Sequence, residues 1–406
     1  MGKIEGIWVR NYGVLRQVGI GSCFLQFAYV NDDTIFTPFQ LSSTTVITGT
    51  NGSGKSTFLD VFAFLADTYR YGLDKALFKR GGYDIVHTLG SEGPISIGIN
   101  YRQDNEQLPV TYTISIGRDI HGRAFIETEM LAYREGTTPF PVLYLQNGKN
   151  TIRYIVPDEG IDDAALNRIE FTDYLHLGIA QLPEHPAYPA LKSIRQLIEG
   201  IHQNNFSTDI ARGLSASATT KFANPRGYSL FTLIKYMEQY GDNFAVLLDR
   251  IVPIFPQISG VRVQKDTDGN PMLFFRISEN WLPATRVSDG ILRLFNYVLL
   301  LEETFPAPLI CIEEAENGLD LVACWRLLDA ITKYNNRDKT SQLFITTHHN
   351  GFVDAVKPET VWVFEQNDTG NTSANRACDD LIIQNILEQG QTLPQDWFSR
   401  YFETKM

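Results

Sequence analysis

Residues 49–56 carry the strongest chemical signal in the chain and read Gly-Thr-Asn-Gly-Ser-Gly-Lys-Ser. This is the G-x-x-x-x-G-K-[ST] spacing of a phosphate-binding loop, which counts as evidence only between a strand and a helix. The preceding run Thr44–Thr48 is β-branched like a strand, and the following run Ser56–Leu65 has the apolar spacing of a helix. The segment therefore predicts a site for a nucleoside triphosphate, and the alternative of a glycine-rich turn without a ligand is much weaker.

Each residue type in this loop has a physical task. The glycines let the backbone approach phosphate oxygens closely, so that successive N–H groups and the helix N-terminus face the negative charge. We expect Lys55 to contact the β- and γ-phosphates and the Ser56 hydroxyl to bind Mg²⁺. The predicted nucleotide contacts in this segment are Gly49, Thr50, Asn51, Gly52, Ser53, Gly54, Lys55, Ser56 and Thr57.

Two carboxylates follow a second apolar run. Leu309–Ile312 is typical of a buried strand, and Glu313 and Glu314 come directly after it. In an α/β sheet this is the end of the strand where a metal is held and water is polarised. We expect Glu313 to be the metal-side carboxylate and Glu314 to be the general base that orients the attacking water. A solvated acidic turn is the alternative, and the phosphate loop in the same chain favours the site.

Three shorter segments complete the predicted site. Ser288 precedes a helical pattern and can cap it, which leaves backbone N–H groups to face an anion. The segment Glu316–Asp320 follows the two carboxylates, and Phe344–His349 ends the next predicted strand. Within that last segment we expect His348 to contact the γ-phosphate.

Together these segments resemble the head of the ABC-type ATPases in the RecF, SMC and OLD-like branch, and more narrowly the small AAA_21-like ATPases. The resemblance covers about residues 1–130 and 258–365. It implies that Gly49–Ser56 is the Walker A loop and that Ser288, Asp289 and Gly290 form the signature. It also implies that Glu313 is the Walker B carboxylate and Glu314 the catalytic glutamate. Asn317–Asp320 would then be the D-loop and His348 the H-loop histidine. Asp320 is thereby a predicted nucleotide contact, and Lys55, Glu314 and His348 are the predicted catalytic residues.

Three positions depart from the pattern of the wider family. Glu313 stands where most relatives have aspartate, which keeps the charge on a longer side chain. The signature reads Val-Ser-Asp-Gly and not the Leu-Ser-Gly-Gly-Gln of transporters. Gln103 is only a weak candidate for the Q-loop glutamine.

The predicted fold is an α/β P-loop NTPase of the ABC-ATPase head type, with a mixed sheet, an antiparallel β subdomain and a helical insertion. Strands alternate with helices around the phosphate loop, and helical spacing occurs at residues 191–201 and 230–251, separated by the small-residue loop 213–220. We expect an N-terminal ATPase lobe at 1–158, a helical insertion or lid at 159–258, and a C-terminal ATPase lobe at 259–406. Further strand patterns are Ile4–Val9, Cys23–Tyr29, Ile95–Tyr101, Val110–Ile116, Ala124–Glu129, Val142–Leu145 and Met272–Ile277.

The resemblance implies a mechanism that needs two copies of the chain. In this family two heads enclose two nucleotides, so Ser288 of one copy meets the γ-phosphate held by Lys55 of the other, in a two-fold homodimer. ATP and Mg²⁺ are the implied cofactors, and a higher oligomer stays open. By analogy with the family, the function is an ATP-hydrolysing switch in DNA metabolism or anti-phage defence that controls a separate effector such as a nuclease, with DNA or RNA as a further candidate partner.

Two other functions remain as alternatives. One is the nucleotide-binding subunit of a membrane transporter, which the absence of the transporter signature disfavours. The other is a nucleotide-gated scaffold that does not hydrolyse ATP, which the glutamate at position 313 suggests.

Composition supports a globular cytoplasmic protein. The chain is 43% hydrophobic and 20% charged, with a formal net charge of −12 that argues against a generally basic nucleic-acid coat. No apolar stretch approaches a membrane span or a secretory signal, and four scattered cysteines form no C-x-x-C pair. The basic cluster Arg70, Lys75, Lys79 and Arg80 fits a solvated helix face and loop better than a phosphate or nucleic-acid contact. The aromatic group Trp397, Phe398, Tyr401 and Phe402 fits a docked terminal helix better than an effector-docking peptide.

Overall fold

The computed structural model describes residues 3–22, 40–102, 109–135, 138–146, 152–154, 167–169, 175–182, 189–204, 249, 251–265, 271–302, 307–336, 341–367 and 369–401. Their packing divides the chain into two compact units. The first comprises Met1–Ile201, Pro308–Cys311 and Thr340–Met406, and the second comprises His202–Ala307 and Ile312–Lys339. The three-part division by sequence position stays a prediction.

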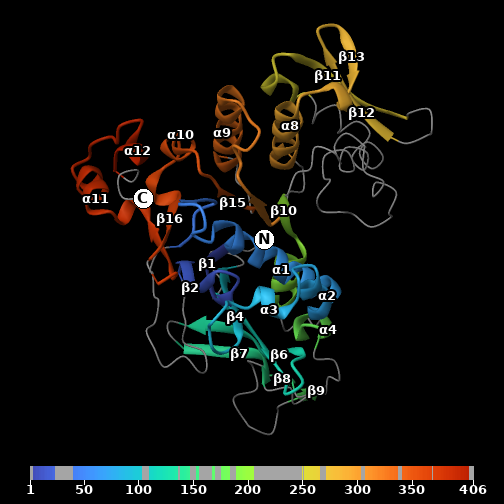
Figure 1. Ribbon diagram of the computed structural model, residues 1–406, viewed down its shortest axis with the longest axis vertical. Coiled ribbons are helices and arrows are strands. Elements are labelled where there is room, and N and C mark those ends of the chain that lie inside the picture. Colours follow the sequence, from blue (N-terminus) through green and yellow to red (C-terminus); the bar gives the residue numbers. More distant parts are fainter. Residues whose placement is uncertain are drawn as a thin grey trace. The chain divides into compact units, whose positions relative to one another are not determined.

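A mixed sheet carries the phosphate loop (Figure 1). Its strand order is β10-β14-β15-β3-β16-β17. The bounds are β10 Ile201–Asn204, β14 Leu309–Ile312, β15 Gln342–Thr346, β3 Thr44–Gly49, β16 Val361–Gln366 and β17 Thr372–Arg376. Strands β15 and β16 pair parallel to β3, and β17 pairs antiparallel to β16. Every residue of β3, β14 and β15 is buried, as expected for central strands covered on both faces.

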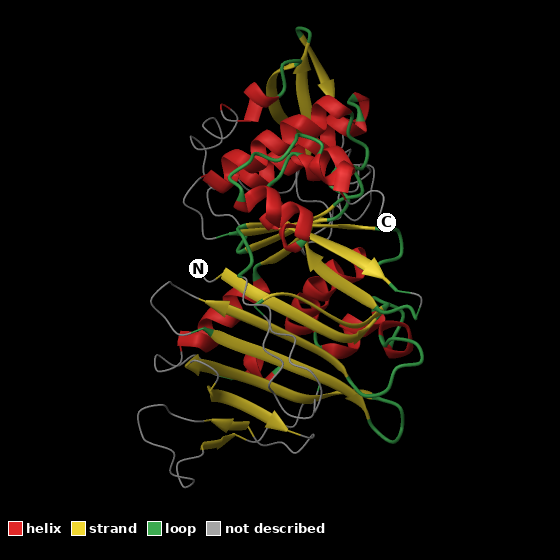
Figure 2. Ribbon diagram, turned by 90° about the vertical axis from the view of Figure 1, so that its left-hand side faces the viewer, coloured by secondary structure: helices red, strands yellow, loops and turns green. Residues whose placement is uncertain are grey.

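An eight-stranded antiparallel sheet forms the predicted β subdomain. Its order is β2-β1-β4-β5-β6-β7-β8-β9, and Figure 2 shows it as a broad layer of strands with helices against one side. The bounds are β1 Lys3–Tyr12, β2 Leu15–Gly21, β4 Ile95–Arg102, β5 Val110–Arg118, β6 Ala124–Glu135, β7 Thr138–Gln146, β8 Ile152–Tyr154 and β9 Asn167–Ile169. All of the pairings described between these strands are antiparallel, which confirms the prediction.

Helix α1, Lys55–Tyr71, is held in the core between the two sheets of the first unit. Phe58 packs on Phe364 of β16 with ring centroids 5.2 Å apart, and Phe62 packs on Phe344 of β15 at 5.1 Å. On another face, Phe64 packs on Tyr12 of β1 at 5.4 Å. Because side chains of α1 pack on both sheets, the position of the phosphate loop at the start of the helix is fixed by two sets of contacts.

The other helices of the first unit are α2 Leu73–Phe78, α3 Tyr83–Val86, α4 Gly178–Gln181, α5 Pro189–Glu199, α10 Asn350–Asp354, α11 Leu381–Glu388 and α12 Trp397–Tyr401. Helix α5 confirms the helical spacing at 191–198, but Ile201 belongs to strand β10, so that part of the prediction is wrong. Trp397 and Phe398 are buried, and the Phe398 N–H donates to Asp354 Oδ1 at 2.6 Å. The C-terminal helix therefore docks on its own core, as favoured above.

The second unit contains a small antiparallel sheet and two long helices. The sheet order is β11-β12-β13, with bounds Ile258–Lys265, Pro271–Ile277 and Asn280–Pro283. Helix α8, Asp289–Glu302, packs against helix α9, Leu321–Asn336, and Phe295 of α8 contacts Phe275 of β12 with ring centroids 5.1 Å apart. Helix α8 begins directly after Ser288, as the sequence predicted.

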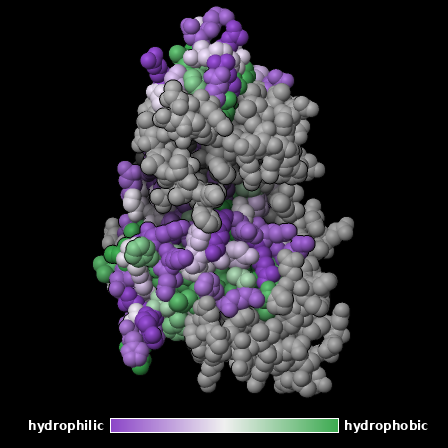
Figure 3. Space-filling view, turned by 90° about the vertical axis from the view of Figure 1, so that its right-hand side faces the viewer, coloured by the Kyte–Doolittle hydropathy of each residue, from purple (hydrophilic) through white to green (hydrophobic). Residues whose placement is uncertain are grey.

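Several predicted features lie outside the described residues. They are the strand at Cys23–Tyr29, the loop 213–220, most of the helical segment 230–251 and Gln103. Among the described helices, none is long and apolar enough to cross a membrane. On the face shown in Figure 3, hydrophilic residues predominate among the coloured atoms, and hydrophobic ones gather only in small groups.

Candidate nucleotide-binding site

The loop between β3 and α1 has the backbone geometry that its glycines predict. A β-carbon on Gly49, whose φ is 142°, would collide with the carbonyl oxygen of Phe364, so no other residue fits there. Gly52 has a φ of 83° and no atom within 4 Å of the position that a β-carbon would take. The loop is therefore packed tightly on its strand side and leaves room at Gly52, where a phosphate group would lie.

Lys55 is folded back over this loop. Its Nζ donates to the carbonyl oxygen of Gly49 at 2.8 Å and of Thr50 at 2.7 Å, and it lies 3.5 Å from Ser53 Oγ. The side chain is buried, at 4% exposure. The ammonium group is thus held within the loop, where charged phosphate oxygens would be stronger acceptors than these carbonyl groups.

The start of α1 fits an anion. The first N–H groups of a helix have no partner within the helix and need a cap or a ligand. Here the N-cap is Gly54 and no side-chain hydrogen bond caps it within the described chain. Ser56 is exposed in the first turn, so its hydroxyl is accessible. The loop residues therefore fit the phosphates of ATP, with Ser56 suited to a Mg²⁺ ion that keeps most of its other ligands from water and phosphate.

The predicted H-loop histidine follows the strand beside β3. Thr346 of β15 stands opposite Ile47, and the Thr347 N–H donates to the Ile47 carbonyl at 3.1 Å. His348 comes next and is exposed. Because β15 and β3 are parallel, His348 leaves the sheet at the same edge as the phosphate loop.

In the second unit, the signature and the D-loop lie against each other. Ser288 Oγ accepts from the Ile291 N–H at 3.4 Å, so it caps α8 as predicted. A β-carbon on Gly290 would lie 2.9 Å from the carbonyl oxygen of Gly318. The side chain of Arg293, one turn further along α8, also reaches Gly318, with Nε 3.1 Å from the position of a β-carbon there. Arg293 was missed in the sequence, where it looks like any polar residue on a helix.

Glu314 adopts an unusual backbone conformation. Its φ is 44°, in the left-handed region that costs a non-glycine residue roughly 1–3 kcal/mol and that occurs often at functional sites. The Asn317 N–H donates to the Glu314 carbonyl at 2.8 Å, and Asn317 Nδ2 donates to Glu314 Oε2 at 3.2 Å. The turn therefore orients the Glu314 carboxylate, while its neighbour Glu313 is half-buried.

Asp320 has a structural role within the same unit. Its Oδ1 accepts from the Ala323 N–H at 2.8 Å, which caps α9. This bond neither requires nor prevents a nucleotide contact. The predicted site residues thus form two groups: the phosphate loop and His348 belong to the first unit, and Ser288, Asp289, Gly290, Glu313, Glu314 and Asp320 belong to the second.

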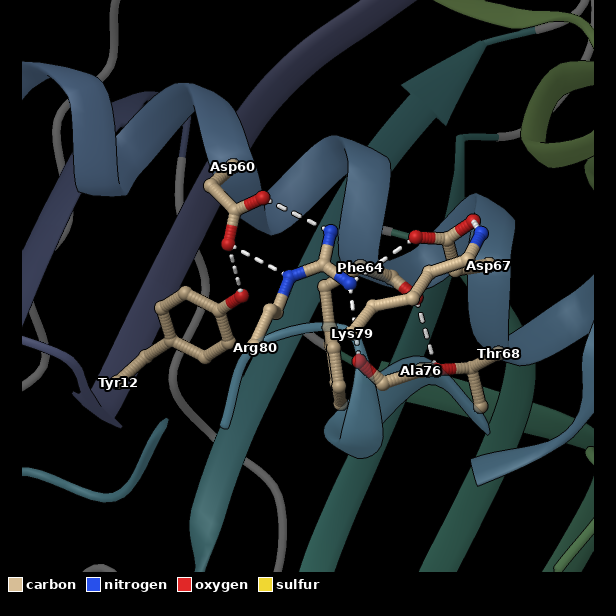
Figure 4. A network of polar contacts seen from close by, with 8 residues as sticks. All are labelled: Tyr12, Asp60, Phe64, Asp67, Thr68, Ala76, Lys79 and Arg80. Carbon is tan, nitrogen blue, oxygen red and sulfur yellow. Dashed lines mark hydrogen bonds and ion pairs between the residues drawn. The ribbon is translucent and has the colours of Figure 1, made fainter. Parts of the chain in front are cut away.

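Two of the four residues of the basic cluster noted in the sequence, Lys79 and Arg80, are neutralised within the first unit (Figure 4). Arg80 forms a two-pronged ion pair with Asp60 at 2.7 and 2.8 Å and a third bond to Asp67 at 3.0 Å. Lys79 also pairs with Asp67, at 2.6 Å. The Tyr12 hydroxyl donates to Asp60 at 2.6 Å. Arg80 and Lys79 therefore tie the α1–α2 region together and do not form an open phosphate site.

Fold and site together define the class of the protein: it is a P-loop ATPase with the head fold of the ABC-type ATPases. The chain belongs to the AAA_21 family, described as AAA domain, putative AbiEii toxin, Type IV TA system, whose model matches residues 44–354. It is accordingly a nucleotide-binding protein of the P-loop class. No curated protein matches the chain.

Solved SMC heads have the same fold. An SMC head bound to the C-winged helix domain of ScpA is 13% identical, with 92% of this chain and 97% of that chain covered and a TM-score of 0.52. An SMC head with an extended coiled coil, from Pyrococcus furiosus and bound to the C-terminal domain of ScpA, is 14% identical, with 96% and 99% covered and a TM-score of 0.51. At this identity the likeness establishes the fold alone.

Proposed function

We propose that this protein hydrolyses ATP and uses it to join two copies of the chain as a switch. The observation that carries the proposal is the phosphate loop itself. Buried Lys55 is held within it, and the adjoining helix start has no side-chain cap among the described residues. Such a cradle favours the triphosphate group, which is the part of ATP that hydrolysis changes.

In the proposed reaction, Lys55 neutralises the β- and γ-phosphates, and Ser56 and Glu313 are the residues that would hold Mg²⁺. When bound, the ion would supply charge neutralisation at the phosphate oxygens. Glu314 orients a water molecule and accepts its proton as the oxygen attacks the γ-phosphorus, and His348 contacts the transferred phosphoryl group. The constrained turn at Glu314 supports this role, since a carboxylate that is already oriented needs little rearrangement during the reaction.

The proposed dimer places Ser288, Asp289 and Gly290 of one copy at the nucleotide of the other. Support comes from the second unit, where the start of α8 and the D-loop segment are packed together and would approach a partner as one surface. The ATP γ-phosphate would then bridge the two copies, and hydrolysis would release them. Homodimers of this kind bury the same surface on both copies.

The proposed biological role is control of a separate effector, such as a nuclease, in anti-phage defence or DNA metabolism. The family description, with its toxin and Type IV TA system, supports a defence role. The solved SMC heads, which carry a bound piece of ScpA, support binding of a separate protein. Among the alternatives, a scaffold that does not hydrolyse ATP keeps the same dimer without turnover.

The proposal is tested by measuring phosphate release and native mass for the wild-type chain and two variants. We expect Glu314→Gln to bind ATP, to form a stable dimer with it, and to release phosphate at least about 100-fold more slowly. Lys55→Ala should lose ATP binding and the ATP-dependent dimer. Wild-type turnover by Glu314→Gln would refute the assignment of the base. Absence of phosphate release by the wild type, with an ATP-dependent dimer retained, would favour the scaffold.

A further inference from the structure

A cavity of about 480 Å³ that opens widely to solvent lies in the first unit, beside the phosphate loop but not lined by it. Its walls come from the β1–β2 hairpin, the loop after α3 and the β16–β17 turn. They include Arg10, Arg16, Gln17, Ser91, Glu92 and Asn371. The volume is that of an ordinary small-molecule site.

The hairpin and the loop are joined by a dense set of hydrogen bonds. Asn11, 3% exposed and with a φ of 55°, donates from Nδ2 to the carbonyl oxygens of Glu92 at 2.8 Å and Pro94 at 3.1 Å. The Gly13 N–H donates to the Val86 carbonyl at 2.6 Å, and Thr88 Oγ1 donates to the Leu15 carbonyl at 3.1 Å. These hydrogen bonds fix the hairpin and the loop relative to each other, so the cavity between them is a stable feature of the fold.

The side chains that line this cavity are mainly donors. Within the described chain neither Arg10 nor Arg16 forms an ion pair, in contrast to Arg80 and Arg102. Arg16 lies along the loop, with a guanidinium nitrogen 3.9 Å from the position of a β-carbon on Gly90. Glu92 is the one carboxylate among the lining residues and makes no ion pair with them. Two cations against one anion leave a local positive charge on a chain of net charge −12.

One lining residue, Ser91, has a hydroxyl without a hydrogen-bond partner among the described residues. Its Oγ is shielded from solvent. A buried polar group without a partner costs roughly 1–3 kcal/mol, so such groups are often completed by a ligand or by water. An oxyanion in the cavity would offer an acceptor to both guanidinium groups, whereas the Ser91 hydroxyl, which solvent does not reach, would have to rotate to join them.

We propose that this cavity is a second anion site, separate from the phosphate loop, that binds the phosphate ester of a nucleotide. Guanidinium groups match the oxygens of a phosphate in a two-pronged geometry, and Gln17 and Asn371 add amide groups for a sugar or a second oxygen. Among the described residues that line the cavity none is aromatic, so the cavity suits the sugar and phosphate more than a stacked base. The ligand is a mononucleotide or the backbone of a nucleic-acid strand, which share this chemistry.

Two residues next to the cavity lining contact the phosphate loop. Leu15, next to Arg16, lies against Gly54, where a β-carbon would collide with its Cδ2. Thr372, next to Asn371, donates from Oγ1 to the Ser53 carbonyl at 3.0 Å. Because the two sites are neighbours, a test of the cavity has to exclude binding through Lys55.

The test uses the full chain in the Lys55→Ala background, with fluorescence anisotropy of two probes, a labelled AMP and a labelled single-stranded 12-mer. We expect at least one probe to bind, and Arg16→Gln to weaken that binding about ten-fold, as does Arg10→Gln, because each removes a charged hydrogen-bond donor. Glu92→Gln should tighten it. Binding of AMP identifies a mononucleotide site, and binding of the 12-mer alone identifies a strand.

Arg123→Gln is the matched control, since this arginine is 77% exposed in the β5–β6 turn, away from the cavity lining. It should bind both probes like the parent. Arg16 is itself exposed, so Arg16→Gln is expected to fold, which a melting curve checks. The proposal is wrong if neither probe binds, or if Arg10→Gln and Arg16→Gln bind as tightly as Arg123→Gln.

Discussion

Gly290 and the Gly318 carbonyl are so close that a β-carbon on Gly290 would lie 2.9 Å from that oxygen. The contact joins the start of α8 to the segment after the two glutamates. On helix propensity alone, Gly290→Ala would stabilise α8 by about 0.5–1 kcal/mol.

We predict the opposite: Gly290→Ala lowers the melting temperature, and Gly290→Val lowers it further, because backbone at this distance has to move. ATP binding through the phosphate loop should persist, while phosphate release falls in the same order. Thermal unfolding and an ATP titration of both variants check this. A higher melting temperature for Gly290→Ala would show that the close approach is relieved at little cost.

Glu129 gives the protein a pH-dependent stability. Its carboxylate is fully buried and accepts from the N–H groups of Gly178 at 2.5 Å and Ile179 at 3.0 Å and from the Tyr112 hydroxyl at 2.9 Å. Burial raises its pKa from 4.5 to about 7, against the opposing effect of these donors. Between these two values the folded state binds more protons than the unfolded state, so stability falls as pH rises through that window.

We therefore predict that the unfolding free energies of the wild type and Glu129→Gln differ by an amount that changes between pH 5 and 8. The change is on the order of 3 kcal/mol, with the wild type losing stability relative to the variant as pH rises. Urea unfolding at several pH values measures it, and other titrating groups cancel in the difference. A difference that stays constant across this range would mean that Glu129 does not titrate there.

The Tyr12–Asp60–Arg80 network should behave as a unit in stability measurements. Burial raises the pKa of Tyr12 well above its usual value, with Asp60 adding to the effect, so the hydroxyl stays protonated and donates. We predict that Tyr12→Phe costs about 1 kcal/mol, and that Asp60→Ala costs about 2–3 kcal/mol because it leaves a mostly buried guanidinium without its two-pronged partner. Denaturant unfolding of both variants checks these values.

The double variant Tyr12→Phe, Asp60→Ala shows whether the Tyr12 hydroxyl and the Asp60 carboxylate contribute to stability together or independently. In the network, the double variant should lose less than the sum of the two single variants, because Tyr12 has no acceptor once Asp60 is gone. Strict additivity would show that the hydroxyl and the carboxylate act independently.

Packing around α1 makes a further prediction about the phosphate loop. Phe62 is fully buried and lies against Phe344 of β15, so Phe62→Ala should destabilise the first unit by about 3–5 kcal/mol. Phe62→Leu keeps most of the volume and should cost less than half as much. Because α1 carries Lys55, ATP affinity should fall in the alanine variant at temperatures where it is still folded. Unchanged affinity with lost stability would mean that the loop holds its shape without the helix packing.

Local patterns were enough to predict the elements that carry the site. Strands β3, β14 and β15 and helices α1 and α8 lie where their apolar runs, glycines and caps predicted them, since each pattern is complete within about fifteen residues. Strand β2 was missed because Leu15–Gly21 mixes polar residues and glycine, and it becomes a strand by pairing with β1. Strands β16 and β17 likewise take their place from β3 and from each other.

Whether a charged residue is neutralised or can bind a ligand depends on residues that are distant in the sequence. Arg80 reads as part of a basic cluster until Asp60, twenty residues away, neutralises it. Arg10 and Arg16, which no motif marks, gain their proposed role only because the loop around Ser91 and the distant Asn371 form a cavity with them. Spacing in the sequence cannot show such tertiary contacts, since they depend on how the sheets and loops pack together.

The phosphate loop at Gly49–Ser56 is therefore what the sequence by itself determined, because its chemistry lies in consecutive backbone N–H groups and one lysine. The tertiary structure decided how that loop is positioned. Helix α1 packs between two sheets, and Lys55 donates hydrogen bonds to carbonyl groups of the loop. It also decided which arginines are neutralised and which line a cavity. Burial and long-range pairing set those outcomes, and both arise only when the chain has closed.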